Sequence, residues 1–133
     1  MRELSLHVVG ADYPNRKGGQ GGGGDRRFEI LLCRAGEPMT LVPEPKNPVD
    51  PAAVAVFSVR GVQIGYLTAE RAPWIGGMIR AGRPLSAIFQ QPTRGGAAIR
   101  VGLDGHAPQL PDATPPAPVE KPDFWPDDIP PDD

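Results

Sequence analysis

Residues 47–51, NPVDP, place two polar side chains in a short segment bounded by prolines. Proline fixes the backbone angle φ, and Asn and Asp side chains hydrogen-bond their own backbone in turns. The simplest interpretation is therefore a turn that leads into the apolar segment that follows. The same turn is also a candidate binding site, because Asn47 can donate and accept hydrogen bonds and Asp50 can accept them. Held on one rigid loop, the two could read a ribose hydroxyl or a base edge.

Other chemistry-bearing residues form no catalytic arrangement. The glycines of GQGGGG, residues 19–24, match G-x-G-x-x-G, but strand-like sequence follows them where a dinucleotide site needs a helix. The single cysteine, Cys33, excludes an intrachain disulfide, and with His7 and His106 it is too little for a zinc site. Cys33 is expected to be a small core residue. We predict a protein that is not an enzyme and that has no metal or cofactor.

The charge is divided unevenly along the chain. Residues 1–105 carry 13 Lys and Arg against 9 Asp and Glu, a balance of +4, whereas residues 106–133 carry one Lys and seven acids, a balance of −6. Nine of the 18 prolines lie from Pro108 onward, which is typical of disordered sequence. We therefore predict a mildly basic domain over 1–105, with a flexible glycine-rich loop over 14–26, and a disordered acidic tail over 106–133. A basic domain is compatible with nucleic acid.

Alternating and β-branched segments predict a mainly β domain. Strands are expected at residues 4–13, 27–34, 37–45, 53–59, 62–67, 85–91 and 97–103. A turn over 68–72 and a helix from about Pro73 to Gly82 would follow the fifth strand, with Trp74, Ile75, Met78 and Ile79 packing into the core. Because strands greatly outnumber helices and do not alternate with them, we predict a small antiparallel barrel with one helix covering an opening.

Nothing in the sequence has the length of a membrane span, which needs about 20 apolar residues. The first ten residues also carry too short an apolar run for a signal peptide. Together with the single cysteine, these features predict a cytoplasmic protein without a membrane partner.

Two segments resemble the HIRAN domain: VVGADY at residues 8–13, and EPKNPVDPAAVAVFSVRGVQIGYLTAERA at residues 44–72. The resemblance extends over about residues 4–91, and the chain is most similar to members of the family that occur alone in bacteria. It implies an OB-like β-barrel with a helical element after the G-Y-L strand. It also implies binding of single-stranded DNA, with the 3′-hydroxyl end held in a pocket, in repair or replication.

The resemblance assigns a set of candidate nucleic-acid-binding residues. The aromatic after VVG would stack on a base, the N-P-x-D pair would lie near the terminal sugar, the neighbouring lysine would meet a phosphate, and the aromatic of G-Y-L would line the site or the core. These residues are Tyr13, Asn47, Asp50, Lys46 and Tyr66. Pro14 and Val49 stand where DNA-binding members often carry aromatic residues, which would weaken stacking.

The tail offers a different function. Its segment DFWPDDIP resembles the acidic tip of bacterial single-stranded-DNA-binding proteins, which implies capture of a repair or replication protein. The residues that would make this contact are Phe124, Trp125, Asp127, Asp128 and Ile129. The alternative to DNA binding is therefore a protein-interaction adaptor that keeps the barrel and acts through its tail. The acidic tail would also be able to cover the basic face and compete with DNA.

Overall fold

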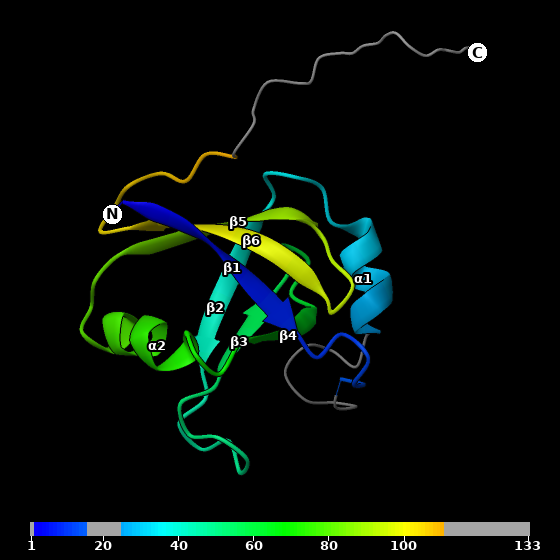
Figure 1. Ribbon diagram of the computed structural model, residues 1–133, viewed down its shortest axis with the longest axis horizontal. Coiled ribbons are helices and arrows are strands. Elements are labelled where there is room, and N and C mark those ends of the chain that lie inside the picture. The colour runs from blue at the N-terminus through cyan, green and yellow to red at the C-terminus, as the bar shows by residue number, and fades with distance from the viewer. Residues whose placement is uncertain (1, 16–24, 111–133) are drawn as a thin grey trace, which may run out of the picture.

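Eight elements make up the computed structural model, which describes residues 2–15 and 25–110 (Figure 1). In chain order they are β1 (Glu3–Val9), α1 (Arg26–Leu32), β2 (Pro38–Pro43), β3 (Val54–Phe57), β4 (Gln63–Leu67), α2 (Ala72–Arg80), β5 (Leu85–Pro92) and β6 (Ala97–Leu103). The five residues assigned above to partner capture by the tail lie outside the described residues.

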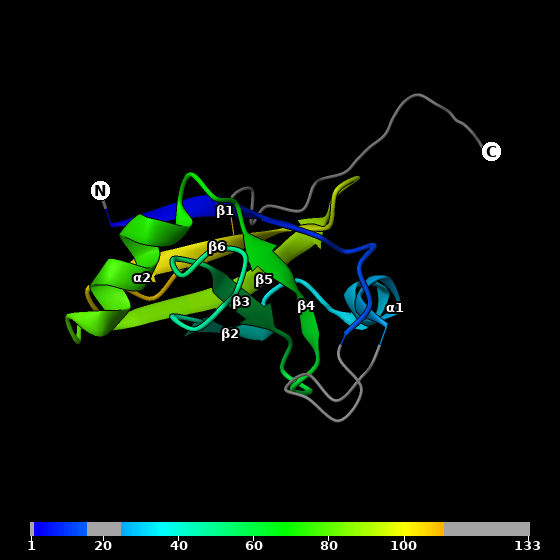
Figure 2. The same ribbon diagram turned by 90° about the horizontal axis from the view of Figure 1, so that it is seen from below.

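The strands close into a barrel in the order β1-β4-β3-β2-β5-β6, and every neighbouring pair is antiparallel. Apolar side chains that alternate along the strands fill its interior, among them Val8, Val54, Ile64, Ile99 and Val101, each fully buried. The two helices lie at opposite ends of the barrel in both views (Figures 1 and 2). The mainly β class and the antiparallel barrel are thus confirmed.

The predicted strand over 27–34 is wrong, because this segment forms helix α1. Phe28, Ile30 and Leu32 alternate as in a strand, but Asp25 caps a helix: its side chain accepts the Phe28 N–H at 2.9 Å. The side of α1 that faces the barrel carries two ionisable residues, Arg26 and Glu29, beside Ile30. The alternation of apolar residues therefore predicted a strand where a helix forms. Polar partners inside the protein fix the orientation of this helix.

Helix α2 follows the G-Y-L strand, as predicted. Its first turn contains Pro73, whose missing N–H has no intrahelical role there. It ends before Gly82, which adopts the left-handed φ of +78° that glycine tolerates. Met78 is buried, but the core position predicted for Trp74 is wrong: this ring is 39% exposed and lies 5.9 Å from the guanidinium carbon of Arg71.

A carboxylate at the start of β1 holds the segment that follows β6. Glu3 accepts hydrogen bonds from Arg100 Nε at 2.9 Å and from the Gln109 backbone N–H at 3.0 Å, and His106 Nε2 lies 2.7 Å from its other oxygen. The Gln109 N–H, then Arg100 and His106, lower the pKa of Glu3 from 4.5 to about 2. The ionised Glu3 therefore fastens residues 106–110 to the barrel.

This contact predicts a specific loss of stability in acid. Because the folded-state pKa of Glu3 lies below its ordinary value, its stabilisation is complete above pH 4.5 and disappears as the pH falls towards 2. In thermal unfolding, Glu3→Gln should lower Tm at pH 6, and the difference from wild type should vanish near pH 2. The control is Glu70→Gln, since Glu70 makes no hydrogen bond or ion pair with any described residue. A Tm difference that stays constant from pH 6 to pH 2 would contradict this role.

Candidate nucleic-acid interface

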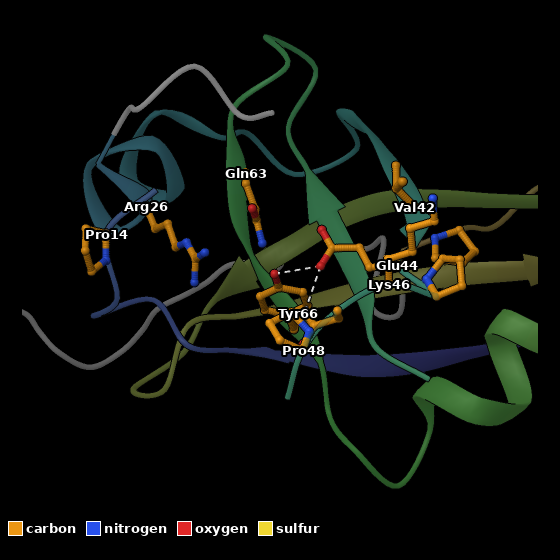
Figure 3. A pocket seen from close by; sticks show the side chains of 11 residues that line it. Pro14, Arg26, Val42, Glu44, Lys46, Pro48, Gln63 and Tyr66 are labelled. Carbon is orange, nitrogen blue, oxygen red and sulfur yellow. Dashed lines mark hydrogen bonds between the residues drawn. The ribbon is translucent and has the colours of Figure 1, made fainter. Parts of the chain in front are cut away.

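A pocket of about 550 Å³ opens beside the N-P-x-D loop (Figure 3). Its walls come from β2, the loop after β2, β4, the start of α1 and the segment after β1. The lining residues are Pro14, Arg26, Val42, Pro43, Glu44, Pro45, Lys46, Asn47, Pro48, Gln63 and Tyr66. Prolines supply much of the wall formed by β2 and the loop after it, so the backbone on that side of the pocket is rigid.

The N-P-x-D loop is a turn held by its own side chains. Asn47 Oδ1 accepts the N–H groups of Val49 at 2.8 Å and Asp50 at 3.0 Å. Asp50 Oδ1 in turn accepts the Ala52 N–H at 2.8 Å. Asn47 lines the pocket, whereas Asp50 is not among the lining residues. The turn expected from the residues alone is therefore present, and both polar side chains contribute to its shape.

Glu44 joins this loop to the barrel. Its Oε1 accepts a hydrogen bond from Tyr66 Oη at 2.8 Å and another from Asn47 Nδ2 at 2.9 Å. Tyr66 lies near the end of β4, so these two bonds connect the G-Y-L strand with the N-P-x-D loop. The two sequence motifs are therefore linked in space, because a residue of each donates a hydrogen bond to Glu44. The carboxylate of Glu44 lies on this side of the pocket (Figure 3).

Arg26 forms the opposite side of the pocket, and its side chain is buried. Its Nε donates to Asn15 Oδ1 at 2.7 Å, and its Nη1 donates to the Gly10 carbonyl at 3.0 Å. The Tyr66 ring lies 5.5 Å from its guanidinium carbon, within the range of a cation–π contact. Asn15 is fixed in turn, because its Nδ2 donates to the backbone carbonyl of Gln63 at 3.0 Å. The guanidinium therefore has a well-defined position.

The partners of Arg26 are neutral. Over residues 2–15 and 25–110, no carboxylate lies within ion-pair distance of its guanidinium. Residues 16–24, which join β1 to α1, include no Asp or Glu. A buried cation is costly unless an anion or strong hydrogen bonds accompany it. The pocket thus holds a buried positive charge on one side and a carboxylate on the other.

The candidates assigned from the sequence are distributed unequally around this pocket. Lys46, Asn47 and Tyr66 line it, and Asp50 lies in the adjoining turn. Tyr13 is 70% exposed and lies outside the pocket lining, next to Pro14, which belongs to it. The sequence therefore identified one wall of the pocket and left the opposite wall unassigned.

Sequence reasoning missed the residues of the second wall. Arg26 was assigned to the end of a flexible loop, and Asn15 and Gln63 received no role, yet these three side chains are buried together. The available signal was Asp25, a favourable helix N-cap directly before Arg26. A helix starting there would have placed Arg26 in its first turn, opposite Phe28.

A second buried polar cluster fastens α1 to the barrel. Glu29 Oε2 accepts hydrogen bonds from Ser58 Oγ and Arg60 Nε, each at 2.6 Å. Cys33 follows this helix and is half-buried, not part of a strand. Burial, reinforced by the charge of Glu29, raises the pKa of its thiol to about 11, so Cys33 is protonated at neutral pH and is a poor nucleophile.

Residues 2–15 and 25–110 contain no group of three or more His, Cys, Asp or Glu side chains placed to hold a metal ion. Neither α1 nor α2 has the length and hydropathy that a membrane-spanning helix requires.

The fold and this pocket define a class: a small antiparallel β-barrel domain with a polar pocket under a proline-bounded turn. The family model of the HIRAN domain matches residues 2–92, and the chain belongs to the HIRAN domain family. This family is known for DNA binding, and its domains are generally DNA-binding modules without catalytic activity. A search of curated proteins found no match.

Two solved structures share the fold. The HIRAN domain of human HLTF aligns with a TM-score of 0.60 and 21% identity, over 77% of this chain and 74% of that one. A protein from Lactobacillus plantarum aligns with a TM-score of 0.60 and 18% identity, over 78% of this chain and 93% of that one. At these identities the likeness concerns the fold.

Proposed function

We propose that this chain is a non-catalytic module that binds single-stranded DNA and recognises its 3′-hydroxyl end, in DNA repair or replication. The observation that carries the proposal is the division of charge in the pocket, with buried Arg26 on one side and Glu44 on the other. The last nucleotide of a DNA strand has the matching chemistry, because it presents a phosphate on its 5′ side and a hydroxyl on its 3′ side.

The phosphate would lie against Arg26. A guanidinium forms strong, charge-assisted hydrogen bonds with phosphate oxygens, and Arg26 has only neutral partners among the described residues. The exposed side chain of Lys46 would meet a phosphate at the rim of the pocket. Because Arg26 is already oriented by Asn15 and Gly10, little side-chain entropy remains to be lost on binding.

The 3′-hydroxyl would donate to the carboxylate of Glu44. One oxygen of Glu44 already accepts hydrogen bonds from Tyr66 and Asn47, and the other has acceptor capacity left. A phosphate in the same place would be repelled by this charge, so Glu44 would also exclude 3′-phosphorylated ends. Asn47 then acts by positioning Glu44, and Asp50 by holding the turn.

The test is fluorescence anisotropy with two single-stranded oligonucleotides of the same sequence, one ending in a 3′-hydroxyl and the other in a 3′-phosphate. We expect tighter binding of the hydroxyl end. Glu44→Gln removes the negative charge and, if its oxygen keeps the bonds to Tyr66 and Asn47, puts an NH2 donor where the second carboxylate oxygen stood, so it should bring the two affinities closer together. Equal affinity of the wild-type protein for both ends would overturn end recognition, and failure to bind either would overturn the DNA-binding function.

The exposed ring of Tyr13 is expected to add affinity beside the pocket. Base stacking on an aromatic side chain is worth about 1–3 kcal/mol per base, so Tyr13→Ala should weaken binding by roughly fivefold or more. Tyr13→Phe, which keeps the stacking surface, should bind like wild type. Trp74→Ala is the matched control, because Trp74 is also exposed but lies on α2, away from the pocket lining. The proposed stacking role would be wrong if Tyr13→Ala bound as tightly as the control.

A further inference from the structure

The solvent side of α1 is apolar, which is unusual for a surface helix. Phe28 is 59% exposed, Leu31 is 73% exposed and Leu32 is 45% exposed. These three residues, called the α1 outer face below, lie at positions i, i+3 and i+4, so they form one contiguous stripe. Surface helices normally turn such a stripe towards the core, and an exposed apolar patch is typical of an interaction site.

Two exposed arginines lie near the α1 outer face. Arg34 follows the helix, and Arg94 lies in the β5–β6 turn, which is fixed beside α1 because Arg27 Nη2 donates to the Arg94 carbonyl at 3.1 Å (Figure 1). Neither the Arg34 nor the Arg94 side chain has an acidic partner among residues 2–15 and 25–110. The ligand expected on this surface is therefore both apolar and acidic.

The chain itself contains one segment with that chemistry. Residues 16–24 consist of Arg, Lys, Gln and glycines, so they carry no apolar side chain that could cover the stripe. Residues 111–133 carry seven acids and one lysine, a net charge of −6, and include Phe124, Trp125 and Ile129. Asp123 precedes the adjacent Phe124 and Trp125, and Asp127 and Asp128 separate that pair from Ile129. The tail therefore combines large apolar side chains with acids, which complements an apolar stripe that has arginines beside it.

We propose that residues 123–129 of the tail dock on the α1 outer face of the same chain. The described chain leaves the barrel at residues 109–110, near Glu3, and β1 spans about 24 Å from there towards α1 at ~3.4 Å per residue. At ~3.1 Å per residue, the rise of an extended proline-rich linker, the 14 residues 111–124 could span about 43 Å. The tail is therefore long enough to reach α1.

The tether makes even a weak contact effective. A linker that can span the two sites gives an effective concentration on the order of 1 mM. At that concentration, a segment with an intrinsic Kd of about 0.1 mM would be docked in roughly nine of ten molecules. The apolar residues would supply the contact area, while the aspartates would pair with Arg34 and Arg94 and make the contact sensitive to salt.

The test compares backbone amide NMR spectra of four full-length proteins. Wild type is compared with a Phe124→Ser/Trp125→Ser double variant, with Leu31→Asp on the α1 outer face, and with Ala69→Asp. Ala69 is an exposed position next to α2, and its variant adds the same charge at the other end of the barrel. The double variant leaves the barrel unchanged, so loss of folding cannot imitate loss of docking.

We expect the double variant to shift the amides of residues 27–34, whereas Ala69→Asp should leave them in place. The Trp125 indole signal should move towards its solvent-exposed position in Leu31→Asp and not in Ala69→Asp. Unchanged amides at 27–34 in the double variant would overturn the proposal. So would shifts that grow with protein concentration, which would indicate docking on a second copy. If the amide signals of residues 27–34 did not change in the tail variant but shifted on adding a single-stranded oligonucleotide, the face would bind nucleic acid. That result would also overturn the proposal.

Discussion

Replacing Arg26 by methionine should weaken binding of a 3′-hydroxyl oligonucleotide by roughly tenfold to a hundredfold. Hydrogen bonds to charged groups are worth about 1.5–3 kcal/mol, and Arg26 is the buried cation that faces Glu44 across the pocket. The measurement is anisotropy at several salt concentrations. For single strands each neutralised phosphate contributes about 0.7 to the slope of log K against log[salt], so the variant's slope should be shallower by about that amount.

Two further variants separate a phosphate contact from a general loss of charge. Arg80→Met removes the same charge from α2, which does not line the pocket, so its affinity and slope should stay close to wild type. Arg26→Lys keeps the charge but loses the Nε hydrogen bond to Asn15, so it should keep the salt slope while losing part of the affinity. If Arg26→Met and Arg80→Met had the same slope, Arg26 would not contact phosphate.

Arg26→Met will also affect stability, because the bonds to Asn15 and Gly10 are lost. A merely unfolded variant would imitate a binding defect. Thermal unfolding must therefore show that the variant is folded at the temperature of the titration. The salt slope adds a second criterion, since a reduced folded fraction lowers apparent affinity equally at every salt concentration, whereas a lost phosphate contact changes the slope.

Replacing Gly65 by alanine should have the largest effect on folding. Gly65 lies in the G-Y-L strand with φ +154°, a conformation that side chains disfavour, and an added Cβ would collide with the Val9 backbone carbonyl of the neighbouring strand. The backbone conformation alone is worth about 1–3 kcal/mol, and β1 would have to move as well. For a domain of this size we expect Tm to fall by on the order of 10 °C or more, as measured by calorimetry.

Gly77→Ala is the matched control with the opposite sign. Gly77 lies inside α2, and nothing would lie within 4 Å of an added Cβ. Alanine is favoured over glycine in a helix by roughly 0.5–1 kcal/mol, so this variant should be slightly more stable than wild type. Should both variants lower Tm alike, the close approach of β4 to β1 would not be the cause of the Gly65 effect.

Local sequence alone predicted the strands, the turn of the N-P-x-D loop and the approximate ends of α2. Alternating and β-branched apolar segments predicted the strands that form β1–β6, and the prolines and short polar side chains predicted the turn at Asn47 and Asp50. Pro73 and Gly82 marked the approximate ends of α2 for the same reason, because each restricts or permits particular backbone angles wherever it stands.

Only the tertiary structure decided the orientation of α1 and the second wall of the pocket. Phe28, Ile30 and Leu32 alternate as in a strand, yet the segment is a helix capped by Asp25. Its orientation is fixed because Arg26 and Glu29, on its inner side, find hydrogen-bond partners in other parts of the fold. Those partners lie far along the chain, so no local pattern reveals them. The meeting of Arg26 with Tyr66, and of Tyr66 with Glu44, arises because barrel closure brings distant segments together.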